Sequence, residues 1–141
     1  MGTHSARVTW LIQRARRVLR TGRLALGDED YSSAINRAYY AIFYAANAAL
    51  STLGLERSKH SGVISEFRTQ FVKTGLIEPT YSQFYGDTMD ARQSSDYDFM
   101  LEPGAEQAAA ALDEAQQFVG RIEQYLEEHG YDSTANLVEP E

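Results

Sequence analysis

The chain has 141 residues, a length that suits one domain with a single buried core. Apolar residues make up 43% of the sequence, which argues against a disordered chain. There is no cysteine, and this excludes a disulfide framework, a thiolate metal site and a cysteine nucleophile. The sequence has no run of about 18 apolar residues and no apolar signal segment in residues 1–10, so we expect a soluble cytoplasmic protein that does not bind membranes.

Charge is divided unevenly along the chain. Residues 1–73 carry eleven Lys and Arg against five Asp and Glu, which is a net +6, whereas residues 74–141 carry two against fifteen, which is a net −13. The whole chain therefore has a net charge of −7. Two interpretations stay open: the basic part could meet nucleic acid, or the two parts could complement each other within one fold or across a dimer.

Apolar residues recur with the period of an α-helix, and no segment alternates as a strand would. Four or five helices are expected, over residues 6–26, 31–53, 61–73, 79–97 and 103–126. The fold class is therefore an all-α bundle. We expect this bundle to occupy residues 1–126 and an acidic, loosely packed tail to occupy residues 127–141.

Several residues mark where these helices begin and end. Gly27 suits a C-terminal cap, and Asp28 or Asp30 suits the N-cap that follows it. Pro79 and Pro103 suit the first position of the last two helices, because proline lacks the N–H that is unused there.

The same period predicts which residues are buried. The first helix is expected to bury Val8, Leu11, Ala15, Val18, Leu19, Gly22 and Leu26. Its arginines lie outside that stripe: Arg7, Arg14, Arg16, Arg17, Arg20 and Arg23. The second helix is expected to bury mainly alanines, with Ile35, Ile42 and Leu53. The fifth is expected to bury Ala105, Ala108, Leu112, Ala115, Val119, Ile122 and Leu126.

The second helix also has a polar sector rich in tyrosine. Its members are Ser33, Asn36, Arg37, Tyr40, Tyr44, Asn47 and Ser51. A plain solvent face would hold more Lys and Glu, so the sector suits a groove that offers hydrogen bonds and ring surfaces. A half-buried dimer seam also favours tyrosine, and both interpretations stay open.

Arg92 projects into the apolar stripe of the fourth helix. That stripe otherwise consists of Tyr81, Phe84, Tyr85, Thr88 and Ser95. An arginine there needs a partner, and Asp96 lies one turn further on. Arg92 either forms an internal ion pair with Asp96 or points its guanidinium into a cleft that binds phosphate.

The remaining chemistry-bearing residues point to no metal or cofactor. His60 follows Lys59 at the start of the third helix, where the pair could cap the helix or help it to bind an anion. The sequence has no Glu-x-x-His pair, His-Glu-x-x-His, P-loop or GxGxxG motif. Asp87, Asp90 and Asp98 form no convincing metal cluster, so no metal is expected.

Three blocks of this sequence together resemble the small prokaryotic branch of the HEPN (higher eukaryotes and prokaryotes nucleotide-binding) domain family. They are residues 33–46 (SAINRAYYAIFYAA), residues 59–64 with 71–76, and residues 91–98 (ARQSSDYD). The resemblance implies an up-and-down helical bundle that forms a homodimer. It also implies pairing with a nucleotidyltransferase in a toxin–antitoxin arrangement.

Many HEPN toxins are ribonucleases that share a motif, an arginine followed after four to six residues by a histidine. The resemblance places that arginine at Arg92, but Tyr97 stands where the histidine is expected. Phe99 stands where the toxin branch has a tyrosine that the partner modifies. Histidine is suited to taking a proton near neutral pH, whereas tyrosine, with a pKa near 10, is not.

These departures favour a homodimeric binding module over a nuclease. In this interpretation the module binds a nucleotidyltransferase-type partner and holds nucleotide or RNA phosphate in a cleft. The cleft residues are expected to be Arg37, Tyr40, Lys59, His60, Arg92, Asp96 and Tyr97. The alternative is a metal-independent ribonuclease toxin in which Arg92 and Tyr97 are catalytic, and a third possibility is a structural dimer without a ligand.

Overall fold

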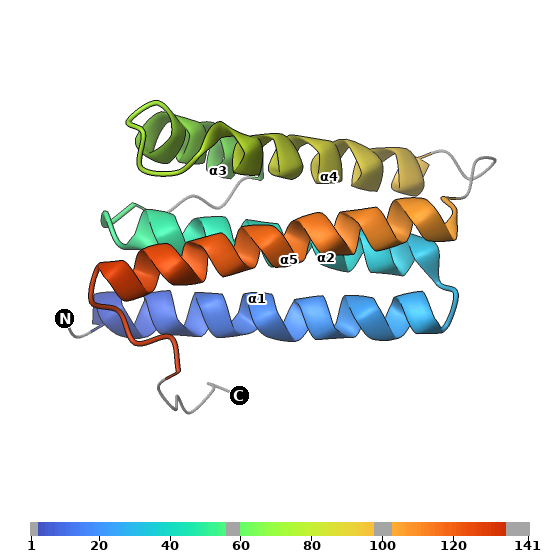
Figure 1. Ribbon diagram of the computed structural model, residues 1–141, viewed down its shortest axis with the longest axis horizontal. Coiled ribbons are helices and arrows are strands. Elements are labelled where there is room, and N and C mark those ends of the chain that lie inside the picture. Colours follow the sequence, from blue (N-terminus) through green and yellow to red (C-terminus); the bar gives the residue numbers. More distant parts are fainter. Residues whose placement is uncertain (1–2, 56–59, 98–102, 135–141) are drawn as a thin grey trace.

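The computed structural model describes residues 3–55, 60–97 and 103–134. Within these ranges the chain forms helices and no strand, which confirms the predicted all-α bundle. The elements are α1 (Thr3–Gly27), α2 (Tyr31–Ser51), α3 (His60–Phe67), the π-helical turn η1 (Arg68–Val72), α4 (Pro79–Tyr97) and α5 (Ala105–Glu128). Figure 1 shows α1 and α4 on opposite sides of α2 and α5.

Local chemistry sets both ends of α2. The Asp30 carboxylate accepts a hydrogen bond of 3.3 Å from the backbone N–H of Ser33, so Asp30 is the N-cap. Gly27 is the last residue of α1, and Glu29 takes the left-handed conformation with φ 62°. At the other end, Leu53 lies beyond the helix and is 45% exposed, so its predicted burial is wrong.

The start of α5 also differs from the prediction. Pro79 is the first residue of α4 as expected, but Pro103 lies outside α5, whose N-cap is Gly104. The Gln107 side chain accepts a 3.0 Å hydrogen bond from the backbone N–H of Gly104. Ala105 consequently sits in the exposed first turn, and its predicted burial is wrong.

The core is built around α2, which contacts every other α-helix. Its alanines are fully buried and leave room for close helix packing. A second, aromatic part of the core joins α3, η1, α4 and α5. Phe118 lies 5.3 Å from Phe67 and 5.8 Å from Tyr85 between ring centroids, and Phe67 stacks on Phe71 at 5.4 Å. Tyr85 thus fastens α4 to the bundle two turns before Arg92.

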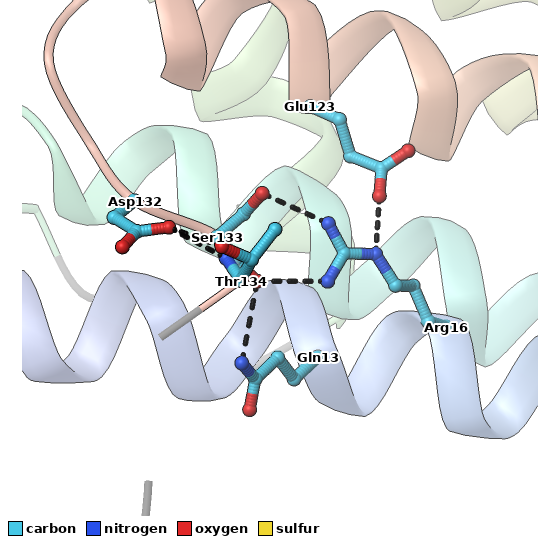
Figure 2. A network of polar contacts seen from close by, with 6 residues as sticks. All are labelled: Gln13, Arg16, Glu123, Asp132, Ser133 and Thr134. Carbon is cyan, nitrogen blue, oxygen red and sulfur yellow. Dashed lines mark hydrogen bonds and ion pairs between the residues drawn. The ribbon is translucent and has the colours of Figure 1, made fainter. Parts of the chain in front are cut away.

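The end of the described chain packs more closely than predicted. Residues 127–134 complete α5 and then fold back along α1, so the expected loose packing is wrong for them. Gln13 and Arg16 both donate to the carbonyl oxygen of Ser133, at 3.2 and 2.8 Å (Figure 2). Arg16 also bonds the Ser133 hydroxyl at 2.9 Å and forms an ion pair with Glu123.

Glu114 of α5 lies near two other carboxylates. Partial burial, together with Asp87 of α4 and Asp113, raises the pKa of Glu114 above its usual value. The folded state therefore holds this proton more tightly than the unfolded chain does, and ionisation of Glu114 opposes folding as pH rises.

We therefore expect Glu114→Gln to raise the melting temperature at neutral pH. The gain should vanish at acidic pH, below the ordinary glutamate pKa of about 4.3, because the wild-type side chain is then protonated too. Thermal unfolding at several pH values measures this. Glu127→Gln, at an exposed position of the same helix, is the control and should leave the melting temperature unchanged at both neutral and acidic pH. An equal gain in both variants, or a gain that persists at acidic pH, would contradict the prediction.

Candidate functional site

The candidate site is centred on Arg92, which α4 directs toward α2. Arg92 is half-buried, and its guanidinium carbon lies 5.0 Å from the ring centroid of Tyr39 and 5.4 Å from that of Tyr40. Both distances fall within the range of a cation–π interaction. The structure thus brings Arg92 and Tyr40, two of the predicted site residues, into contact.

Tyr39 is a member of this site that the sequence analysis missed. It is fully buried, and its ring meets that of Tyr40 edge to face at 5.2 Å between centroids. Burial raises the pKa of Tyr39 to about 12, although the positive charge of Arg92 acts in the opposite direction. Tyr39 is therefore a neutral platform for Arg92. Its position one turn after Ile35, on the buried stripe of α2, was the signal that could have identified it.

Half-buried aromatic side chains continue from this point along α2 and onto α1. We call the set the aromatic surface, and it consists of Trp10, Tyr40, Phe43 and Tyr44. Trp10 meets Tyr44 edge to face at 6.5 Å, and the guanidinium carbon of Arg14 lies 5.8 Å from the Tyr44 ring centroid. An arginine therefore borders the aromatic surface at each end, Arg92 on one side and Arg14 on the other.

The polar sector predicted on α2 does not form one continuous groove. Asn47 and Ser51 are buried, and Ser51 accepts a 3.2 Å hydrogen bond from the Nε of Arg7. Arg37 is exposed at the opposite end and packs beside Gly22 of α1. Within the described part of the chain Arg37 forms no hydrogen bond or ion pair, so it is not joined to Arg92.

The structure describes no side chain for the other predicted site residues. Asp96 and Tyr97 belong to the last turn of α4 and His60 to the first turn of α3, but their side chains lie outside what the structure describes. Lys59 lies outside the described residues altogether. The Arg92–Asp96 ion pair and the roles of Lys59, His60 and Tyr97 stay predictions.

The chemistry that this site offers is cationic and aromatic. A guanidinium fork can bind phosphate oxygens with two parallel hydrogen bonds, and ring faces can stack on a nucleobase. Among the described residues, no three His, Cys, Asp or Glu side chains are grouped so as to hold a metal ion. No helix in the described ranges is both long and apolar enough to span a membrane.

Comparison with known proteins identifies the family. A model of the HEPN domain matches residues 8–134. A "UPF0332 protein" from Thermotoga maritima is 38% identical over 116 residues, which cover 82% of this chain and 88% of that protein. Two proteins of Methanocaldococcus jannaschii are also similar. "Putative toxin MJ0605" is 37% identical, covering 84% of this chain and 87% of its own length. "Putative toxin MJ0142" is 31% identical, covering 82% and 79%. The chain belongs to the HEPN domain family.

Proposed function

We propose that this HEPN-domain protein is a homodimeric binding module that holds a nucleotide or RNA phosphate at the Arg92 site and pairs with a nucleotidyltransferase-type protein. The observation that supports it best is the position of Arg92. Its guanidinium is held over two tyrosine rings, while it remains half-buried rather than enclosed. A bound phosphate would meet a cation whose direction is already set, which lowers the entropy lost on binding.

The aromatic surface supports the proposed homodimer. Its four rings are half-buried in the single chain, and aromatic residues are enriched at the centre of protein interfaces. Pairing of two chains through this surface would bring two Arg92 sites close to a common seam. The nucleotidyltransferase-type partner rests on the family resemblance alone, and co-purification with such a protein expressed alongside this chain is its test.

A second candidate function is supported by the names of two relatives. The Methanocaldococcus proteins are called toxins, and the family resemblance associates HEPN toxins with metal-independent RNA cleavage. In such a reaction a base takes the proton of the 2′-hydroxyl and a cation stabilises the charged phosphorane. Arg92 suits the second task. Tyr97, at the position expected for histidine, is the candidate for the first.

The test is a titration of a fluorescent single-stranded RNA and of adenosine triphosphate with Arg92→Ala. We expect the variant to fold and to bind at least one of these probes more weakly, by about 1.5–3 kcal/mol or roughly ten- to a hundredfold. Arg92→Lys should bind the probes with an affinity between those of the wild type and Arg92→Ala. Lysine keeps the positive charge but lacks the planar guanidinium that makes two parallel hydrogen bonds. Lys73→Ala is the control, since it removes one exposed positive charge from a different part of the bundle.

The same samples distinguish the alternatives. Incubation of the RNA in EDTA shows whether the wild type cleaves it. Cleavage that Arg92→Ala abolishes would favour the ribonuclease. Equal binding by wild type and Arg92→Ala would exclude the proposed site, and an unfolded Arg92→Ala would assign Arg92 a structural role. Sedimentation that reports a monomer at every concentration would contradict the homodimer.

A further inference from the structure

Two adjoining open hollows lie along the outer face of α1, and residues 133–134 form a wall of the first. The first has a volume of about 330 Å³. Its lining is Gln13, Arg16, Arg17, Arg20, Ser133 and Thr134. The second, of about 310 Å³, shares Arg16 and Arg20 with the first, adds Arg23, and extends toward α5. We call Arg16, Arg17, Arg20 and Arg23 together the arginine groove; Figure 2 shows Arg16 and Gln13 against the wall that residues 133–134 form.

The arginine groove concentrates positive charge on an acidic protein. Its four arginines are opposed by one carboxylate in the lining, that of Glu123, while the whole chain has a net charge of −7. Four positive charges on one helix face therefore stand against the overall negative charge of the chain. The arginine groove therefore forms a local positive patch, and such a patch attracts anions.

Hydrogen bonds fix part of the arginine groove and leave part of it available. Arg16 is held by Glu123 and by Ser133, and Arg23 bonds the Gln116 side chain. Arg20 lines both hollows, is exposed, and forms no hydrogen bond or ion pair with any residue that the structure describes. Its guanidinium donors are therefore available to a ligand.

The lining indicates what kind of anion would bind. Arginine, an amide and two hydroxyls line the first hollow, and all of them are typical contacts of a phosphodiester backbone. That hollow has no aromatic or aliphatic lining residue, and the second has only Leu19 and Val119, both buried, whereas protein interfaces usually have apolar anchors at their centre. From Arg16 to Arg23 the helix rises about 10 Å, which suits a strand with successive phosphates better than a single phosphate.

We infer that the arginine groove binds the phosphodiester backbone of a nucleic-acid strand, for which single-stranded RNA is the probe, with Arg20 as the main contact and Arg17 and Arg23 adding charge. Without ring surfaces for stacking, binding here is independent of base sequence. The arginine groove lies on α1, on the far side of α2 and α5 from the Arg92 site on α4 (Figure 1). The inference is therefore independent of the proposed function.

The test measures binding of single-stranded RNAs of about twelve nucleotides and differing sequence over a range of salt concentrations. We expect Arg20→Glu to weaken binding at least about tenfold for every sequence, and each lost phosphate contact to reduce the salt slope by about 0.7. Arg20→Gln should have a smaller effect in the same direction. Lys73→Glu, an equal charge reversal at an exposed position outside α1, should bind like the wild type.

The Arg92→Ala background separates this inference from the proposed function. The loss caused by Arg20→Glu should persist there, because distant sites contribute additively. Undiminished binding by Arg20→Glu, or an equal loss in Lys73→Glu, would overturn the inference, as would a wild type that binds no RNA. Arg20-dependent binding of inorganic triphosphate or of an acidic protein, without any Arg20-dependent binding of RNA, would also overturn it.

Discussion

Replacing Phe118 with alanine is expected to lower the free energy of unfolding by about 3–5 kcal/mol. The Phe118 side chain is fully buried on α5, and its ring contacts Phe67 of α3 and Tyr85 of α4. Its removal would leave a cavity where three helices meet, and apolar neighbours relax only partly around such a cavity. Chemical denaturation followed by circular dichroism measures the loss.

The position of this contact also predicts where the damage appears. Tyr85 packs α4 against Phe118 of α5, and α4 carries Arg92. Because Phe118→Ala removes this contact, amide exchange should increase more in α4 than in α1. Phe118→Leu should cost much less, about 1.5 kcal/mol at most, because it conserves most of the volume. Leu24→Ala is the matched truncation at a side chain that is 76% exposed, and should change stability by less than about 0.5 kcal/mol. A loss in Phe118→Ala as small as that in Leu24→Ala would contradict the prediction.

The helices could be predicted because their residues satisfy local rules. Asp30 caps α2 through its own side chain, and Pro79 begins α4, as the sequence analysis expected. The start of α5 was misplaced because Pro103 and Gly104 are adjacent and either can begin a helix. The structure uses Gly104 in an extended conformation as the N-cap, which leaves Pro103 outside. Local chemistry alone does not decide between two such neighbours.

The candidate site was predictable only in part, because helical periodicity assigns a residue to a face and not to a partner. The position of Arg92 in an apolar stripe correctly indicated that it needs a partner, and an ion pair with Asp96 was the partner considered. The rings of Tyr39 and Tyr40 on a different helix are partners that spacing within α4 does not reveal. Arg14 is a similar case, since it was expected on the solvent face and lies over Tyr44.

The arginine groove was the least predictable feature of the molecule. The arginines of α1 were recognised as one face, but the wall opposite them is formed by residues 133–134. Those residues are held mainly through the backbone carbonyl of Ser133, which accepts from Gln13 and Arg16. Every residue has such a carbonyl, so no pattern in the sequence of 127–141 indicates the contact.

Replacing Gly22 with valine is expected to lower the free energy of unfolding by about 3 kcal/mol. Gly22 is buried where α1 crosses α2 and α5, and it was predicted to lie on the buried stripe. A Cβ at this position would come 2.7 Å from Leu112 Cδ2 and 3.0 Å from Arg37 Cβ. Leu112 is fully buried, so its methyl group has little room to move away.

The alanine variants at Gly22 and Gly120 separate packing from helix propensity. Alanine favours a helix over glycine by about 1 kcal/mol, so Gly22→Ala should lose only about 1 kcal/mol, less than Gly22→Val. Gly120 lies on the exposed face of α5 with nothing within 4 Å of an added Cβ, so Gly120→Ala should gain up to about 1 kcal/mol. Thermal and chemical unfolding of the three variants measure both effects. A gain in Gly22→Ala as large as that in Gly120→Ala would contradict the close approach of α1 to Leu112 and Arg37 at this position.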